Sequence, residues 1–125
     1  MKKILIIDDD TFFAKALSNA LDPRLYEVAT ATDGKKGLDE VQKSMPDAIL
    51  LDIRMPNMDG LEFLKQVNQK YGAGKVPVLI VSNLSSIEKI SEGIELGVRG
   101  YIMKTDESIE SIVSKLESLF SEKQR

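Results

Sequence analysis

Short apolar runs alternate with amphipathic segments five times along this chain, and the alternation limits the folds that it can form. The apolar runs lie at residues 3–7, 26–31, 47–52, 77–81 and 100–103. Continuous runs with β-branched residues are typical of strands that are buried on both faces. Each run precedes a segment with helical spacing, so we expect a parallel sheet with helices on both faces and right-handed crossovers.

Each amphipathic segment has apolar residues at helical spacing, which predicts one apolar face per helix. Thr11 is the expected N-cap of the first helix, and Pro23 follows its end. The apolar positions are Phe13, Ala16, Leu17, Ala20 and Leu21 in the first segment; Leu38, Val41 and Met45 (inward-facing) in the second; Leu61, Leu64 and Val67 in the third; Ile87, Ile90 and Ile94 in the fourth; and Ile109, Ile112, Val113, Leu116, Leu119 and Phe120 in the fifth.

The predicted fold is a doubly wound α/β domain with five parallel strands in the flavodoxin-like order 2-1-3-4-5. The run at 26–31 is less apolar than the others, which favours a place near the sheet edge. A chain of 125 residues fits one domain. We expect this domain to cover residues 1–121 and residues 122–125 to form a frayed tail.

Composition excludes several kinds of function. The net charge of −3 argues against direct binding of nucleic acid. The chain has no cysteine and no histidine, which excludes thiolate chemistry and imidazole as a base or metal ligand. No stretch is long and apolar enough to cross a bilayer, so we expect no membrane contact and a cytoplasmic location.

Three aspartates follow two of the predicted strands. Asp8 and Asp9 close the first run, and Asp52 closes the run at 47–52. In the order 2-1-3-4-5 the direction of connection reverses between strands one and three, and ligands of such sheets bind there. Like charges repel when they are brought together, and a hard divalent cation with oxygen ligands relieves the repulsion. The sequence therefore predicts an acidic pocket that suits Mg²⁺.

Several other residues have simpler structural interpretations when they are taken singly. Asp8 or Asp10 alone could be the N-cap of the first helix, and residues 59–60 could be only a turn before a helix. Ser82 alone would be a loop hydroxyl and Lys104 a solvated surface lysine. Tyr101 alone would be a half-buried aromatic residue with its hydroxyl in water.

Four sequence pieces give these residues a common interpretation. They are Ile-Ile-Asp-Asp-Asp at 6–10, Leu-Leu-Asp-Ile-Arg-Met-Pro-Asn-Met-Asp-Gly at 50–60, Val-Pro-Val-Leu-Ile-Val-Ser at 76–82 and Gly-Tyr-Ile-Met-Lys at 100–104. With these pieces in order at the ends of strands, the chain resembles the receiver domain of bacterial two-component response regulators. The resemblance covers nearly the whole chain and is closest to stand-alone, chemotaxis-regulator-like receivers.

The resemblance implies a site that takes up a phosphoryl group. Asp52 would be the phosphoacceptor, with Lys104 and Ser82 as its catalytic partners at the phosphoryl oxygens. Mg²⁺ would be held by Asp8, Asp9 and Asp52 and by the backbone carbonyl of Arg54. Asp9 would be a direct ligand, and Asp8 would act through water.

The resemblance also implies a switch and its partners. Ser82 and Tyr101 would be the switch residues, and the responding surface would be the fourth helix, fifth strand and fifth helix. A sensor histidine kinase or phosphotransfer protein would supply the phosphoryl group, and a downstream protein would bind the responding surface. The chain would be a monomer or a phosphorylation-linked dimer. It would not be an enzyme in the usual sense, since it would catalyse only its own phosphotransfer and dephosphorylation.

Other classes of function fit the residues less well. A magnesium-dependent phosphatase with an aspartyl nucleophile usually has a second aspartate two residues later, where this chain has Arg54. A pseudo-receiver, which binds partners without phosphorylation, remains the alternative, although such domains usually lose an acidic residue or the lysine. A dinucleotide-binding domain would need a glycine-rich loop after the first strand, where this chain has acidic residues.

Two positions depart from the family pattern. Thr105 follows Lys104, where the family usually has a proline after a cis peptide bond. A cis bond before another residue costs about 3–4 kcal/mol, so either the bond is trans and Lys104 shifts, or the site holds a strained bond. Asn83 replaces the usual small residue after Ser82 and could narrow access to the phosphorylated side chain.

Overall fold

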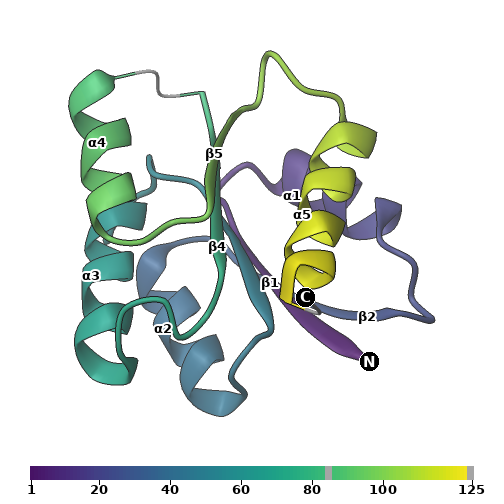
Figure 1. Cartoon of the computed structure of the whole chain (residues 1–125), viewed down its shortest axis with the longest axis horizontal. Helices are drawn as coiled ribbons and strands as arrows, with labels where there is room; N and C mark the ends of the chain where they lie inside the picture. Colours follow the sequence, from purple (N-terminus) through teal and green to yellow (C-terminus); the bar gives the residue numbers. More distant parts are fainter. Residues whose placement is uncertain (84–85, 124–125) are drawn as a thin grey trace.

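Five parallel strands form one sheet, and helices cover both of its faces (Figure 1). The computed structural model describes residues 1–83 and 86–123. The strand order is β2-β1-β3-β4-β5, which confirms the predicted doubly wound fold and the edge position of residues 26–31. The elements in chain order are β1 (Lys2–Ile7), α1 (Thr11–Ala20), β2 (Tyr26–Ala31), α2 (Gly34–Lys43), β3 (Ala48–Leu51), α3 (Gly60–Tyr71), β4 (Val78–Ser82), α4 (Ile87–Glu95), β5 (Gly100–Met103) and α5 (Ile109–Lys123).

Both faces of the sheet are buried, which explains why the strands are continuously apolar. Alternate side chains of a strand point to opposite faces. In β1, Ile4 and Ile6 join a cluster with residues of α1 and α5, whereas Leu5 and Ile7 join a cluster with residues of α2 and α3. In Figure 1, α1 and α5 lie on one side of the sheet and α2, α3 and α4 lie on the other.

The register of the sheet determines where the acidic residues lie. Ile7 of β1 pairs with Ala31 of β2 on one side and with Leu51 of β3 on the other. The backbone N–H of Asp52 donates to the carbonyl of Ile7 at 2.9 Å. Asp8 and Asp52 therefore follow the last paired residues of two adjacent strands.

Helix α1 begins differently from the expectation. Asp10 is the N-cap, and its carboxylate accepts a hydrogen bond from the backbone N–H of Phe13 at 3.1 Å. The expected cap, Thr11, is instead the first helical residue. The simple interpretation of Asp10 as a cap is thus confirmed, which agrees with the high preference of aspartate for this position.

The buried faces of α1 and α2 also differ from the expected ones. In α1, Ala14 and Leu17 are buried, while Ala16 and Ala20 are exposed. Small residues on a short helix mark its inner face weakly, because alanine is accepted on either side. In α2, Val41 is buried as expected, but Met45 is 39% exposed because the helix has already ended at Lys43.

The isoleucines of α4 do not mark its inner face. Ile87 is 80% exposed and Ile94 is 63% exposed. The helix instead turns Gly93 toward the sheet, where a Cβ would lie 2.9 Å from the terminal methyl group of Ile80. The close approach of helix and sheet at this glycine leaves Ile87 and Ile94 on the outside and Ile90 half-buried.

Helix α5 follows its apolar pattern and is longer than expected. Ile112, Leu116 and Leu119 are buried in the cluster with α1. The helix continues to Lys123, two residues beyond the expected domain boundary at 121. No helix among the described residues is both long and apolar enough to span a membrane.

Gly60 fixes the junction between β3 and α3. A Cβ at this position would lie 2.2 Å from the carbonyl oxygen of Asp52 and 2.9 Å from the Cα of Ile53. The N–H of Gly60 also donates to the carbonyl of Ile53 at 2.8 Å. The helix can therefore start against the end of β3 only where there is no side chain.

Gly60→Ala is expected to lower the free energy of unfolding by about 1–3 kcal/mol or more, since the added methyl group meets backbone and not a movable side chain. Urea denaturation at equilibrium measures the change. Gly100→Ala is the matched control, because the atom that its Cβ meets is a side-chain methyl group of Leu79 at 3.0 Å. Equal losses in the two variants would contradict this account of Gly60.

Candidate functional site

Three carboxylates converge at the carboxyl edge of the sheet, as the sequence predicts. One oxygen from each of Asp8, Asp9 and Asp52 lies within 4.8 Å of the others. Asp8 and Asp52 are buried, and Asp9 is exposed. The group combines two charges shielded from water with one that faces solvent, and oxygen-only donors at this spacing suit a hard divalent cation.

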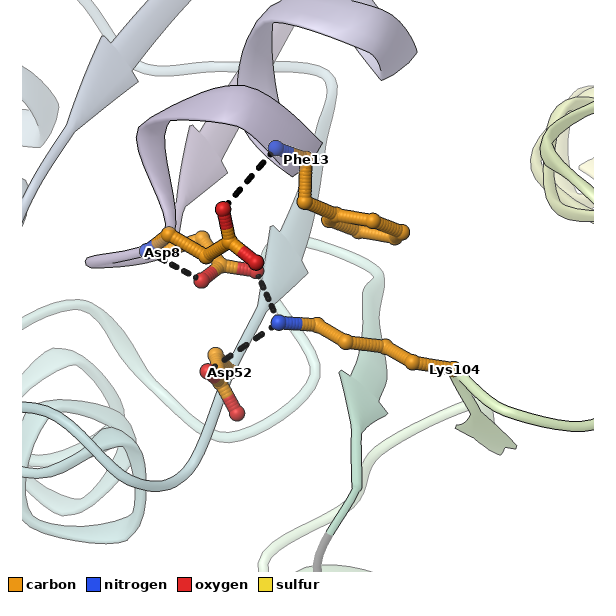
Figure 2. Close-up of polar contacts among 5 residues, drawn as sticks. Asp8, Phe13, Asp52 and Lys104 are labelled. Atoms are coloured by element: carbon orange, nitrogen blue, oxygen red, sulfur yellow. Dashed lines mark hydrogen bonds and ion pairs between the residues drawn. The ribbon is translucent and has the colours of Figure 1, made fainter.

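Lys104 neutralises part of this charge from the end of β5. Its Nζ lies 2.7 Å from Oδ2 of Asp8 and 3.4 Å from Oδ2 of Asp52 (Figure 2). The lysine side chain is only 10% exposed, so it is not the solvated surface lysine of the simpler interpretation. The backbone N–H of Lys104 donates to the carbonyl of Ser82 at 3.1 Å, which ties the residue to the end of β4.

The buried carboxyl group of Asp8 holds its proton unusually well. Burial raises its pKa from 3.8 to about 6, and the charge of Asp52 acts in the same direction. Hydrogen bonds from Lys104 and from the backbone N–H of Asp10 oppose this rise. Burial also acts to lower the pKa of Lys104, but the two carboxylates outweigh it and the net shift is upward. The cluster thus holds more negative charge than its one ammonium group balances.

Ser82 and Tyr101 lie together beside the carboxylates. Ser82 ends β4 and is 1% exposed, and Tyr101 lies half-buried on β5. Burial and the charge of Asp52 raise the pKa of the Tyr101 hydroxyl, while a hydrogen bond with Ser82 lowers it. The tyrosine hydroxyl therefore points toward Ser82 and the site, in contrast to the simpler interpretation in which it contacts only water.

An open hollow of about 440 Å³ leads to Asp52 from solvent. Arg54, the expected source of a backbone ligand, lies on its wall, and so does exposed Asn83. The residues that line the hollow are Asp9, Asp10, Asp52, Arg54, Ser82, Asn83, Ser86 and Lys104. The predicted phosphoacceptor Asp52 and its expected partners Lys104 and Ser82 thus all line the same hollow.

The bond that follows Lys104 has the ordinary geometry. Within the described residues no peptide bond is cis, so Lys104–Thr105 is trans. Lys104 nevertheless reaches both Asp8 and Asp52. Of the two expected alternatives the trans bond is the one found, and it does not remove the lysine from the carboxylates.

Two contributors to the site were not recognised from the sequence. Phe13, assigned only to a helix face, has its ring centroid 4.5 Å from Nζ of Lys104. Gly60, interpreted as part of a turn, allows the start of α3 to lie directly against the backbone of Asp52. Helical spacing does not show which residue faces a lysine ninety positions away, whereas a glycine just after a cap did give a signal for close approach.

The fold and this acidic site define a family, and comparison with known proteins identifies it. The family model described as the response regulator receiver domain matches residues 4–117. The chain belongs to this family of two-component signalling domains. Its structure is similar to a CheY-like receiver domain protein from Methanospirillum hungatei (TM-score 0.89, 27% identity, covering 99% of this chain and 97% of that one). It is also similar to the chemotaxis protein CheY4 of Vibrio cholerae (TM-score 0.84, 34% identity, covering 94% and 98%).

Similar curated proteins are longer than this chain. A protein-glutamate methylesterase/protein-glutamine glutaminase from Oleidesulfovibrio alaskensis is 38% identical over 98% of the chain, which covers 34% of that protein. The response regulator MprA of Mycolicibacterium vanbaalenii is 30% identical over 94% of the chain, which covers 49% of it. The chain spans about a third to a half of the length of these relatives, so the similarity concerns the receiver region.

The pKa of Asp8 predicts how the stability of the metal-free protein depends on pH. The native state binds this proton more tightly than the unfolded chain, so the resulting stability is fully present below pH 3.8 and is lost as the pH rises through about 6. Asp8→Asn is uncharged at every pH. It is therefore expected to be more stable than the wild type at neutral pH, by about 1–2 kcal/mol after allowance for solvent screening.

This advantage should disappear as the pH falls toward 3.8, where both side chains are neutral. Denaturant unfolding in buffer with a chelator, repeated across this range, measures the difference. Asp39→Asn on the exposed side of α2 is the control and should show no such trend. If Asp8→Asn were less stable than the wild type at neutral pH, that result would contradict the conclusion that the buried charge of Asp8 lowers the stability of the native state.

Proposed function

We propose that this chain is a phosphorylation-dependent signalling receiver that accepts a phosphoryl group on Asp52 from a histidine kinase or a phosphotransfer protein. The observation that carries the proposal is the position of Asp52. Its carboxylate is buried at the base of an open hollow, with the Lys104 ammonium at 3.4 Å and a second, protonatable carboxyl group alongside. A nucleophile, a cation for the transferred group and an entrance for the donor are therefore in one place.

The donor set fits Mg²⁺. Asp9 and Asp52 would be direct ligands, Asp8 would act through water, and the carbonyl of Arg54 would supply a further oxygen. Asp9 is the exposed carboxylate of the group, so a hydrated ion reaches it first. Bound Mg²⁺ would offset the excess negative charge and stabilise the oxygens of the transferring phosphoryl group.

The chain's own residues supply the rest of the reaction. An oxygen of Asp52 attacks the phosphorus atom, the bond from phosphorus to the donor nitrogen breaks, and the imidazole of the donor keeps that electron pair. Phosphoryl transfer needs mainly positioning and charge neutralisation from a protein. Lys104 pairs with the new phosphoryl oxygens, and the Ser82 hydroxyl donates a hydrogen bond to one of them.

Phosphorylation would change the surface through Ser82 and Tyr101. The two are hydrogen-bonded in this structure, so a phosphoryl group that recruits the serine hydroxyl removes a partner from the tyrosine. Tyr101 lies on β5, between α4 and α5 in the proposed responding surface. The 80% exposure of Ile87 and 63% exposure of Ile94 give α4 apolar side chains for a downstream protein. Such a switch couples a local hydrogen bond to a partner surface.

The wider setting of the chain is proposed on the same basis. The chain would act in the cytoplasm, where such kinases present their phosphorylated histidine, and would be a monomer or a phosphorylation-linked dimer. The methylesterase activity in the name of one longer relative is a property of that protein. For this receiver region we propose no catalysis beyond its own phosphorylation and dephosphorylation.

Asp52→Asn is expected to abolish labelling by a small-molecule phosphodonor in the presence of Mg²⁺, because the amide cannot form an acyl phosphate. Intact-mass spectrometry measures the labelling, and circular dichroism checks the fold. The matched control is Asp39→Asn, an exposed carboxylate on α2 that should label like the wild type. Full labelling of Asp52→Asn would reject Asp52 as acceptor. A wild type that never labels would favour the pseudo-receiver.

Asp9→Asn is expected to weaken Mg²⁺ binding at least about tenfold, because a direct ligand and one charge are lost from the site. Isothermal titration with Mg²⁺ measures the affinity. Asp10→Asn is the control: Asn keeps the helix cap, and Asp10 is not one of the three clustered carboxylates.

The same variant tests the repulsion between the carboxylates. In buffer with a chelator, Asp9→Asn should be as stable to heat as the wild type or more stable, because one like charge has been removed. Clear destabilisation without metal would mean that Asp9 has a structural role instead.

A further inference from the structure

The ring of Phe13 contacts the ammonium group of Lys104, which also contacts the two carboxylates. Nζ of Lys104 lies 4.5 Å from the ring centroid, within the range of a cation–π interaction. Asp8 and Asp52 contact the same nitrogen at 2.7 and 3.4 Å. Figure 2 shows the ring and the two carboxylates gathered around the lysine head.

Lys104 depends on these few neighbours for its position. Its side chain is 10% exposed, so little water is left to solvate the charge. A cation–π contact is stronger where the cation is desolvated, because no water competes for it. Of the two carboxylates, Asp8 is the nearer to the ammonium group. The contact with the ring adds a third attraction on the same nitrogen, which opposes any movement of the lysine head out of this position.

Phe13 itself is firmly held. Its backbone N–H donates to the carboxylate of the N-cap Asp10 at 3.1 Å, which fixes the first turn of α1. Its partly buried ring packs against the cluster between α1, α5 and the sheet. The backbone after Lys104 lacks a proline ring, since Thr105 follows through a trans bond. The loop after Lys104 therefore lacks the restraint of a proline, and the side chain of Phe13 on α1 restrains the lysine instead.

We propose that Phe13 is a positioning residue for Lys104, which keeps the ammonium group poised over the phosphoacceptor carboxylate through its aromatic face. This role rests on the proposed phosphorylation of Asp52. The cap of α1 is thereby linked to the reaction: Asp10 orients Phe13, and Phe13 orients Lys104.

Variants of Phe13 test the role kinetically. Phe13→Leu keeps an apolar side chain without an aromatic face, and is expected to slow labelling by a small-molecule phosphodonor with Mg²⁺ about three- to tenfold. Phe13→Tyr keeps the aromatic face and should restore most of the rate. In a Lys104→Met background, Phe13→Leu should cause no further loss, because the two residues act as one unit. The proposal would be overturned if Phe13→Leu left the labelling rate unchanged. It would also be overturned if Phe13→Leu slowed labelling as much in the Lys104→Met background as in the wild type.

Nuclear magnetic resonance tests the contact without any phosphorylation. In the metal-free wild type and in Phe13→Tyr, the Cε protons of Lys104 should show an upfield ring-current shift, which Phe13→Leu should remove. The absence of this shift from the wild type would refute the contact. A wild type that shows the shift but takes up no phosphoryl group would contradict the proposed function and the positioning role of Phe13 in it, while leaving the contact in place.

Discussion

The ammonium group of Lys104, held between Asp8 and Asp52, links the end of β5 to the ends of β1 and β3, neither of which is a neighbour of β5 in the sheet. Asp8 follows β1, Asp52 follows β3 and Lys104 follows the edge strand β5. Removing the lysine would leave two buried carboxylates without a neutralising charge. Breaking a buried ion pair in this way is strongly destabilising, because an uncompensated charge stays buried. The carboxyl edge of the sheet therefore has its present arrangement because one cation serves two anions.

The same arrangement leaves a charge imbalance that supports the proposed chemistry of the site. With Asp9 included, three carboxylates share one ammonium group. The raised pKa of Asp8 comes mainly from its burial, and the charge of Asp52 adds to the rise. A site with spare negative charge favours a divalent cation and, once that cation is bound, tolerates a phosphoryl group. Local electrostatics, rather than strain in the backbone, thus prepares the domain for the proposed reaction.

Much of this was predictable from the sequence. Continuous apolar strands separated by amphipathic segments fixed the sheet order, and the sheet order brought Asp8, Asp9 and Asp52 together. The signal was strong because both the fold rule and the charges favour the same edge. The helix N-cap was misplaced by one residue, from Asp10 to Thr11, because both residue types cap helices.

The errors concern tertiary packing. The isoleucines of α4 have helical spacing, yet Gly93 is the residue that the helix buries, because only a glycine permits so close an approach to the sheet. Ile87 and Ile94 are exposed and Ile90 is half-buried. Periodicity identifies an apolar face but not the surface that it contacts. The contact between Phe13 and Lys104 joins the first helix to the last strand, and no local pattern encodes such a pair.

The most direct test is a crystal structure of this chain with Mg²⁺ and a beryllofluoride adduct, a mimic of the acyl phosphate. The account predicts that the adduct lies on Asp52, that the metal is held by Asp9 and Asp52, and that Lys104 has moved from Asp8 onto a fluoride. An adduct on another residue, or a lysine that remains on Asp8 while the mimic is bound to Asp52, would contradict it.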